Sequence, residues 1–234
     1  MKVVITGFLN TMTKPQKIAG FIYLPLHVVI IPLLLAMAAY WLPDGLGELT
    51  ANIIYYSAGL LFCLICMWNY LRGAFDIMLD NPAVSISALI IGYFIWLLLS
   101  YLAAGALLAL LGDKISNPNN DAVLALAENS PRAVLGLAVF IAPIVEETLF
   151  RGVVFGSLRT KHRTLAYIIS IAAFAVYHVW QYALASTDWT LLAYAVQYIP
   201  AGYAMAWTYE KTNSIWIPIF LHMSINLMSM LLLT

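Results

Sequence analysis

Three charged side chains lie inside a strongly apolar stretch, FIAPIVEETLFRGVVFG, at residues 140–156. Glu146 and Glu147 are adjacent, and Arg151 follows Glu147 by four residues. Side chains four residues apart meet on a helix, so Glu147 and Arg151 are expected to form an ion pair. Adjacent helical side chains point about 100° apart, so Glu146 must face a different neighbour. Glu146 is therefore the carboxylate that stays available for chemistry.

Only a few polar side chains in other apolar segments could face Glu146. The segment SIAAFAVYHVWQ contains His178, and IPIFLHMSINLM contains His222 and Asn226 on one helical face. At about 1.5 Å per residue, the four side chains lie roughly 12 to 21 Å from the same membrane boundary, in one layer. A carboxylate, two imidazoles and an amide can activate a water and hold an oxyanion. Hydrolysis of a carbonyl group requires these two functions.

The role of a metal ion is open at this point. Glu146, His178 and His222 would supply the three nitrogen and oxygen ligands of a catalytic zinc site and leave one position for water. The same side chains can also work without metal, with Glu146 as the base and the histidines as hydrogen-bonding partners. The zinc motif HExxH is absent from the chain. We favour the metal-free interpretation and assign no cofactor, with zinc as the alternative.

The composition of the chain tells which elements position these side chains. Of 234 residues, 63% are hydrophobic and 9% are charged, whereas a soluble domain has about 25% charged residues. About 20 apolar residues cross a bilayer as a helix. Seven segments meet this length, at about 20–41, 52–71, 84–112, 132–157, 164–185, 189–209 and 214–233. We therefore predict an all-α, polytopic membrane helical bundle of about seven transmembrane helices, a single integral membrane domain over residues 1–234.

The distribution of Lys and Arg predicts the orientation in the membrane. If the N-terminus is cytoplasmic, the cytoplasmic segments contain Lys2, Lys14, Lys17, Arg72, Arg159, Lys161, Arg163 and Lys211. The opposite side then contains only Lys114 and Arg132. Because cytoplasmic loops carry an excess of basic residues, we predict a cytoplasmic N-terminus. The loop 113–131 would lie on the opposite side, with a short surface helix near residues 122–127.

The remaining features have simpler interpretations. Cys63 and Cys66 have CxxC spacing, but on a membrane helix we expect them to be small packing residues. The tyrosines and Gln197 of AYAVQYIPAGYAMAWTY are candidates for the wall of a substrate groove. Trp189, Trp207 and Tyr209 are equally typical of residues at the membrane interfaces. Equal numbers of acidic and basic residues, eleven of each, indicate no nucleic-acid partner.

Three short motifs resemble those of one known family. EETLFR at 146–151 resembles the EExxxR motif of the CAAX-protease and bacteriocin-processing (CPBP, or Abi) family of intramembrane proteases. FAVYH, from Phe174 to His178, resembles its FxxxH motif, and HMSIN, from His222 to Asn226, its HxxxN motif. The motifs occur in the expected order within residues 132–234, which would be the catalytic core. Residues 1–131, the N-terminal spans and loop, resemble the family only in being hydrophobic.

The resemblance implies a role for each motif residue. Glu146 would activate water with the help of His178, and His222 and Asn226 would bind or polarise the scissile carbonyl. Glu147 and Arg151 would be a supporting pair that holds Glu146, and Phe174 would pack against the site.

These roles imply an intramembrane endopeptidase. We expect it to cut a membrane-associated peptide or protein near the cytoplasmic leaflet, in the plasma membrane of a prokaryote. The alternative is a non-catalytic membrane protein, a bacteriocin-immunity factor or small transporter that uses the buried polar cluster. Whether a substrate is prenylated, and the oligomeric state, cannot be predicted from the sequence.

Overall fold

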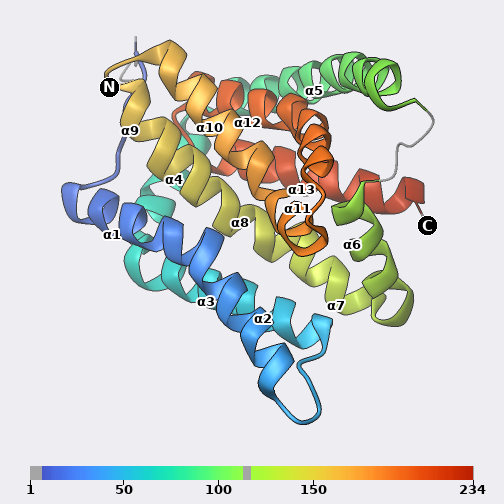
Figure 1. Ribbon diagram of the computed structural model, residues 1–234. Helices are drawn as coiled ribbons and strands as arrows, with labels where there is room; N and C mark the ends of the chain where they lie inside the picture. The colour runs from blue at the N-terminus through green and yellow to red at the C-terminus, as the bar shows by residue number, and fades with distance from the viewer. Residues whose placement is uncertain (1–6, 113–116, 234) are drawn as a thin grey trace.

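The computed structural model describes residues 7–112 and 117–233, and within these ranges the chain is helical, with no strand (Figure 1). The first half contains α1 (Lys14–Pro25), η1 (Leu26–Ile30), α2 (Ile31–Trp41), α3 (Glu48–Cys66), α4 (Trp68–Asp80) and α5 (Pro82–Leu111). Then follow α6 (Pro118–Asn129), α7 (Pro131–Leu135), η2 (Gly136–Ile141), α8 (Ala142–Glu147), η3 (Thr148–Phe155) and α9 (Gly156–Arg159). The chain ends with α10 (Arg163–Tyr177), α11 (Trp180–Ser186), η4 (Trp189–Tyr198), α12 (Ile199–Thr212) and α13 (Trp216–Leu233).

The long helical segment from α7 to α9 is the centre of the molecule. In its most apolar window 61% of the residues are buried, against 11% to 17% in the other long apolar helices. α8 packs against α3 and α13, and η3 packs against α1, α10 and α12. Because other helices surround it, this segment can carry charged side chains that never face lipid. The predicted all-α membrane bundle is confirmed, and the protein is an integral, multi-pass membrane protein.

Fewer helices than predicted have the length of a full span. Among the described residues, four helical stretches are long and apolar enough to cross a membrane: Lys14–Trp41, Glu48–Cys66, Pro82–Ala109 and Pro131–Arg159. α10 and α11 form a fifth if this pair, bent by 44°, counts as one span. The predicted sixth span is interrupted, because η4 gives way to α12 at Ile199, next to Pro200. The count of seven and the cytoplasmic N-terminus stay predictions, and Lys2 and Lys114 lie outside the described residues.

Helix irregularity accompanies the acidic motif. Pro143 lies in the first turn of α8, and the preceding residues, η2, form a π-helix. A second π-helical segment, η3, starts directly after Glu147. Proline has no N–H to donate and its ring crowds the preceding turn, so a widened turn before Pro143 lets the helix continue. Glu146 and Glu147 thus lie on a short α-helical segment between two π-helical ones.

Gly59 determines how closely α3 approaches the acidic motif. A Cβ atom at Gly59 would lie 2.6 Å from Cγ1 of Val145, which is closer than real Cβ atoms come to a neighbour. Without a side chain at this position, α3 can lie against α8. Tyr56 is three residues before Gly59, on the same face of α3, and therefore comes within reach of Glu146.

The loop predicted on the far side of the membrane contains the expected helix. Residues 122–127 fall inside α6, which starts after Asn117, whose side chain caps the helix by accepting from the N–H of Asn119. The interfacial assignment of Tyr209 was wrong. Its side chain is fully buried, and its hydroxyl lies 2.9 Å from that of Tyr70. A buried tyrosine that finds a polar partner packs like other aromatic residues.

Candidate active site

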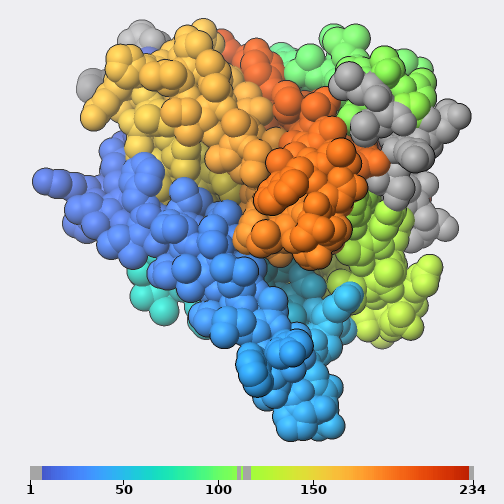
Figure 2. All heavy atoms as spheres, in the orientation of Figure 1, coloured from blue at the N-terminus to red at the C-terminus, as the bar shows by residue number. Residues whose placement is uncertain are grey.

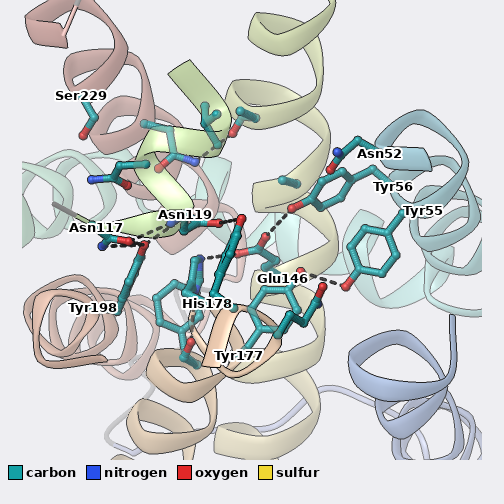
Figure 3. A pocket seen from close by; sticks show the side chains of 18 of the residues that line it. Asn52, Tyr55, Tyr56, Asn117, Asn119, Glu146, Tyr177, His178, Tyr198 and Ser229 are labelled. Atoms are coloured by element: carbon teal, nitrogen blue, oxygen red, sulfur yellow. Dashed lines mark hydrogen bonds and ion pairs between the residues drawn. The ribbon is translucent and has the colours of Figure 1, made fainter. Parts of the chain in front are cut away.

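Glu146 is a buried carboxylate whose two oxygens differ in their surroundings. Its Oε1 atom accepts a hydrogen bond of 3.3 Å from the hydroxyl of Tyr56. Its Oε2 atom is buried and has no hydrogen-bond partner among the described residues. The Nε2 atom of His178 lies 3.7 Å from this oxygen, and that of His222 lies 3.9 Å from it. Figure 3 shows Glu146 between Tyr56 and His178.

The sequence-predicted pairing of Glu147 and Arg151 is present. Nη1 of Arg151 lies 3.0 Å from Oε1 of Glu147, and neither side chain is exposed. Nη2 of Arg151 donates to the backbone carbonyl of Gly202 in α12, at 3.2 Å. The guanidinium also lies over the ring of Phe174, 4.1 Å from its centroid, a favourable cation–π arrangement. These contacts compensate for the burial of both charges.

Both histidines are oriented through their Nδ1 atoms. Nδ1 of His178 lies 2.8 Å from the carbonyl oxygen of Phe174, and Nδ1 of His222 lies 2.9 Å from Oε1 of Glu147. Both partners are acceptors, so each Nδ1 carries the hydrogen, and in a neutral ring Nε2 is left as an acceptor. The two Nε2 atoms and Oε2 of Glu146 are then three converging acceptors. Three such acceptors need a hydrogen-bond donor, such as water, or a cation between them.

Phe174 contributes more than a wall. Its carbonyl accepts from His178, its ring face lies under the guanidinium of Arg151, and its ring forms T-shaped contacts with the rings of His178 and His222. Asn226 also lines the cavity at the site. Its Nδ2 atom donates one hydrogen to the backbone carbonyl of Ala138, at 2.8 Å, and a second hydrogen remains. Every motif residue named from the sequence therefore either lies at the site or contacts a residue that does.

The zinc alternative has the right donor types and an imperfect arrangement. Ligands of a tetrahedral zinc ion with bonds of about 2.0–2.1 Å lie roughly 3.3 Å from one another. The separations from Oε2 of Glu146 to the two Nε2 atoms, 3.7 and 3.9 Å, are longer. In the described part of the chain, no three His, Cys, Asp or Glu side chains are arranged to hold a metal ion as they stand. The chemistry below is therefore built from the side chains alone.

A large cavity reaches the site. Its volume is about 530 Å³, and its inner wall includes Glu146, Phe174, His178 and His222. Asn226, Gln197 and Tyr198 also line it, so the predicted groove role of Gln197 and its neighbouring tyrosine agrees with their position. The outer wall comes from α2, α3 and α6. A cavity of this volume can hold several residues of an extended peptide beside Glu146.

Tyr56 was not named from the sequence as a site residue, and Tyr198 was named only as a candidate for the groove wall. Tyr56 donates to Glu146, and Tyr198 stacks on His178 with ring centroids 4.2 Å apart. The hydroxyl of Tyr198 in turn bonds Asn117 and Asn119 at the start of α6 (Figure 3). Tyr56 lies in an N-terminal span with no motif, so only the close approach at Gly59 indicates its role.

Comparison with known proteins agrees with the motifs. Residues 128–228 match the family model described as type II CAAX prenyl endopeptidase Rce1-like. Over these residues the chain is similar to that family. The match covers α8, α10 and most of α13, and therefore Glu146, His178, His222 and Asn226.

Two bacterial proteins are similar to parts of the chain. The Bacillus subtilis (strain 168) protein named "Putative membrane peptidase YdiL" is 29% identical over 148 residues, 63% of this chain and 56% of that protein. The Lactococcus lactis subsp. lactis (strain IL1403) protein named "UPF0177 protein YxdF" is 33% identical over 94 residues, 40% of this chain and 45% of that protein. The chain thus spans about half the length of the curated relatives it matches. No solved structure matches it.

Proposed function

We propose that this chain is an intramembrane endopeptidase of the CPBP type, in which Glu146 activates a water molecule for attack on a peptide carbonyl. The observation that carries the proposal is the unpartnered Oε2 atom of Glu146, which faces the Nε2 acceptors of His178 and His222. Distances of 3.7 and 3.9 Å are too long for direct hydrogen bonds. One water between these atoms can donate to Glu146 and to one histidine, with its lone pair left for attack.

The proposed reaction proceeds in two steps. In the first, the water gives a proton to Glu146 and its oxygen forms a bond to the carbonyl carbon, which places negative charge on the carbonyl oxygen. In this proposal Asn226, which lines the cavity, stabilises this charge with the Nδ2 hydrogen that it does not donate to Ala138. In the second, the C–N bond breaks and Glu146 returns the proton to the departing amine. The products are a carboxylic acid and an amine, and the acid then passes its proton to the amine or to solvent, which leaves a carboxylate.

Glu147 and Arg151 act in this proposal by positioning. Glu147 accepts from Nδ1 of His222 and so keeps the other ring nitrogen as an acceptor next to Glu146. Arg151 balances the charge of Glu147, which leaves Glu146 as the carboxylate that takes up a proton. His178 receives the same orientation from the carbonyl of Phe174. The catalytic group and its two histidines are thus held by a rigid inner layer.

The test compares membranes that contain the wild-type chain with membranes that contain Glu146→Gln. The amide keeps the shape of the carboxylate and cannot accept the proton, so cleaved peptides found with the wild type should fall by about 100-fold or more. Glu128→Gln, an exposed change on α6, is the matched control and should leave the cleaved peptides unchanged. Undiminished cleavage by Glu146→Gln would overturn the proposal. The comparisons do not favour a non-catalytic protein, which would give no cleaved product with any variant.

A further inference from the structure

Among the described residues, the exposed polar side chains that line the cavity above Glu146 lie towards one end of the bundle. Among its lining residues, Ala39, Glu48, Asn120 and Gln181 are exposed, and they lie near the α2–α3 turn, on α6 and on α11. The α2–α3 turn projects beyond the rest of the molecule at this end (Figure 2). The helix ends that carry Arg159 and Lys211 contribute no lining residue. These exposed polar side chains mark an entrance to the cavity at the end of the bundle that holds α6.

The two ends of the bundle differ in charge. Among the described residues, the end with the opening has five acidic side chains and one basic one: Asp44, Glu48, Asp121, Glu128 and Asp188, against Arg132. The other end has seven basic and three acidic side chains: Lys14, Lys17, Arg72, Arg159, Lys161, Arg163 and Lys211, against Asp76, Asp80 and Glu210. The basic end is the one that the positive-inside rule assigns to the cytoplasm.

Among the described residues, the cavity wall is rich in carboxamides and contains no Lys or Arg. Its polar side chains include Asn52, Asn117, Asn119, Asn120, Gln181, Gln197 and Asn226. Carboxamides both donate and accept, so they pair with the N–H and C=O groups of an extended peptide backbone. A free C-terminal carboxylate would meet no Lys or Arg among these described lining residues and would lie next to Glu146, at a substantial desolvation cost.

We propose that the substrate of this chain is an internal segment of a peptide or protein that reaches Glu146 from the extracytoplasmic face of the membrane. The proposal rests on the proposed peptidase function for the cleavage itself, and it replaces the cytoplasmic leaflet expected from the sequence. The carboxamides bind the substrate backbone, and the acidic mouth at Glu48 favours segments with positive charge near the cleaved bond.

The side of access can be measured without a substrate. Cys66→Ala removes the partly exposed native thiol, while Cys63 is fully buried and can stay. In this background, Asn120→Cys probes the mouth, Asn52→Cys probes the cavity wall, and Lys161→Cys probes the basic end. A membrane-impermeant maleimide added to intact cells should label the first two variants and leave Lys161→Cys unlabelled until the cells are permeabilised. Labelling of Lys161→Cys alone in intact cells would overturn the proposal.

The charge of the entrance gives a second measurement. A cationic methanethiosulfonate reagent should modify Asn52→Cys about threefold or more faster than an anionic one, with a difference that shrinks as salt is added. Glu48→Gln should reduce this preference, while Glu128→Gln, which does not line the cavity, should change it less. Equal rates for both reagents, or no reaction of Asn52→Cys from either side, would contradict the proposed route.

The two proposals fail in different ways. Loss of cleaved peptides in Glu146→Gln together with labelling from the cytoplasmic side would keep the peptidase and reject the extracytoplasmic substrate. Labelling from outside with no cleaved peptides for any variant would keep the route and reject the peptidase, and with it the substrate assignment. When the peptidase is active, peptides added to orientation-sorted proteoliposomes should be cut only on the face where Asn120→Cys is labelled.

Discussion

The Nδ1 atom of His222 lies 2.9 Å from the Oε1 atom of Glu147. The same oxygen accepts a hydrogen bond from Arg151 at 3.0 Å. The second glutamate of the motif is therefore shared by a cation on its own helix and an imidazole on α13. This arrangement fixes which nitrogen of His222 carries its hydrogen, and it separates the two adjacent glutamates into a positioning group and a reacting group.

Arg151→Met should destabilise the protein strongly. The change leaves the charge of Glu147 buried without its ion-pair partner, and removal of one member of a buried pair costs about 3–5 kcal/mol. Glu147→Gln combined with Arg151→Met removes both charges and should recover part of this loss. Arg132→Met, at an exposed position of the same helical span, is the control and should change stability by less than about 1 kcal/mol. Unfolding in detergent monitored by circular dichroism measures all three; equal losses for Arg151→Met and the double variant would contradict the ion pair.

Tyr56→Phe should slow cleavage and leave the fold intact. The change removes only the hydroxyl that donates to Oε1 of Glu146 at 3.3 Å. A hydrogen bond of this length is worth about 1 kcal/mol, or roughly a fivefold change in rate. Tyr101→Phe is the matched control, because Tyr101 is 85% exposed on α5. If Tyr56→Phe cleaves as fast as Tyr101→Phe, the hydroxyl has no part in orienting Glu146.

The acidic motif could be predicted because charge is rare in this chain. A carboxylate, two histidines and an amide at similar depth stand out among apolar residues, and the ion pair of Glu147 with Arg151 follows from their spacing alone. The bond from His222 to Glu147 could not be predicted. The helical rotation of α13 relative to α8 depends on the packing of both against their neighbours.

Two further features lie beyond sequence patterns. Tyr56 reaches Glu146 because Gly59 allows α3 to approach Val145, and this close contact has no periodic signature. The helix that was predicted across residues 189–209 divides into η4 and α12, because its first half packs as a 3-10 segment against α10 and α11. Average hydropathy measures how apolar a segment is, and it says nothing about such breaks.

Removal of divalent metal should leave the proposed activity in place. In the mechanism proposed above, Glu146 and the two histidines bind the reacting water directly. A chelator therefore has no catalytic metal ion to remove. Purified protein treated with a chelator and analysed for bound metal should cleave a peptide substrate at the rate of untreated protein. A loss of activity that zinc alone restores would instead assign Glu146, His178 and His222 as ligands.

The basic end of the bundle contains a charge cluster that should make stability depend on acid pH. Glu210, at the end of α12, accepts from Nε of Arg163 at 2.8 Å, from Nη2 of Arg163 at 2.8 Å and from the hydroxyl of Tyr167 at 2.8 Å, and it also contacts Arg159. Partial burial raises the pKa of Glu210, but the hydrogen bonds from Arg163, Tyr167 and Arg159 outweigh this effect and lower the pKa from its usual 4.5 to about 2.

Because the pKa of Glu210 is lower in the folded protein than in the unfolded chain, its ionised form stabilises the fold above about pH 4.5. This stabilisation should be lost as the pH falls from about 4.5 towards 2. Glu210→Gln cannot ionise, so the variant should be less stable than the wild type at pH 7, and the difference should narrow between pH 4.5 and pH 2. Thermal unfolding of both proteins in detergent across this range measures it, with Glu128→Gln as the control. A difference that stays constant down to pH 2 would show that Glu210 acts through shape rather than charge.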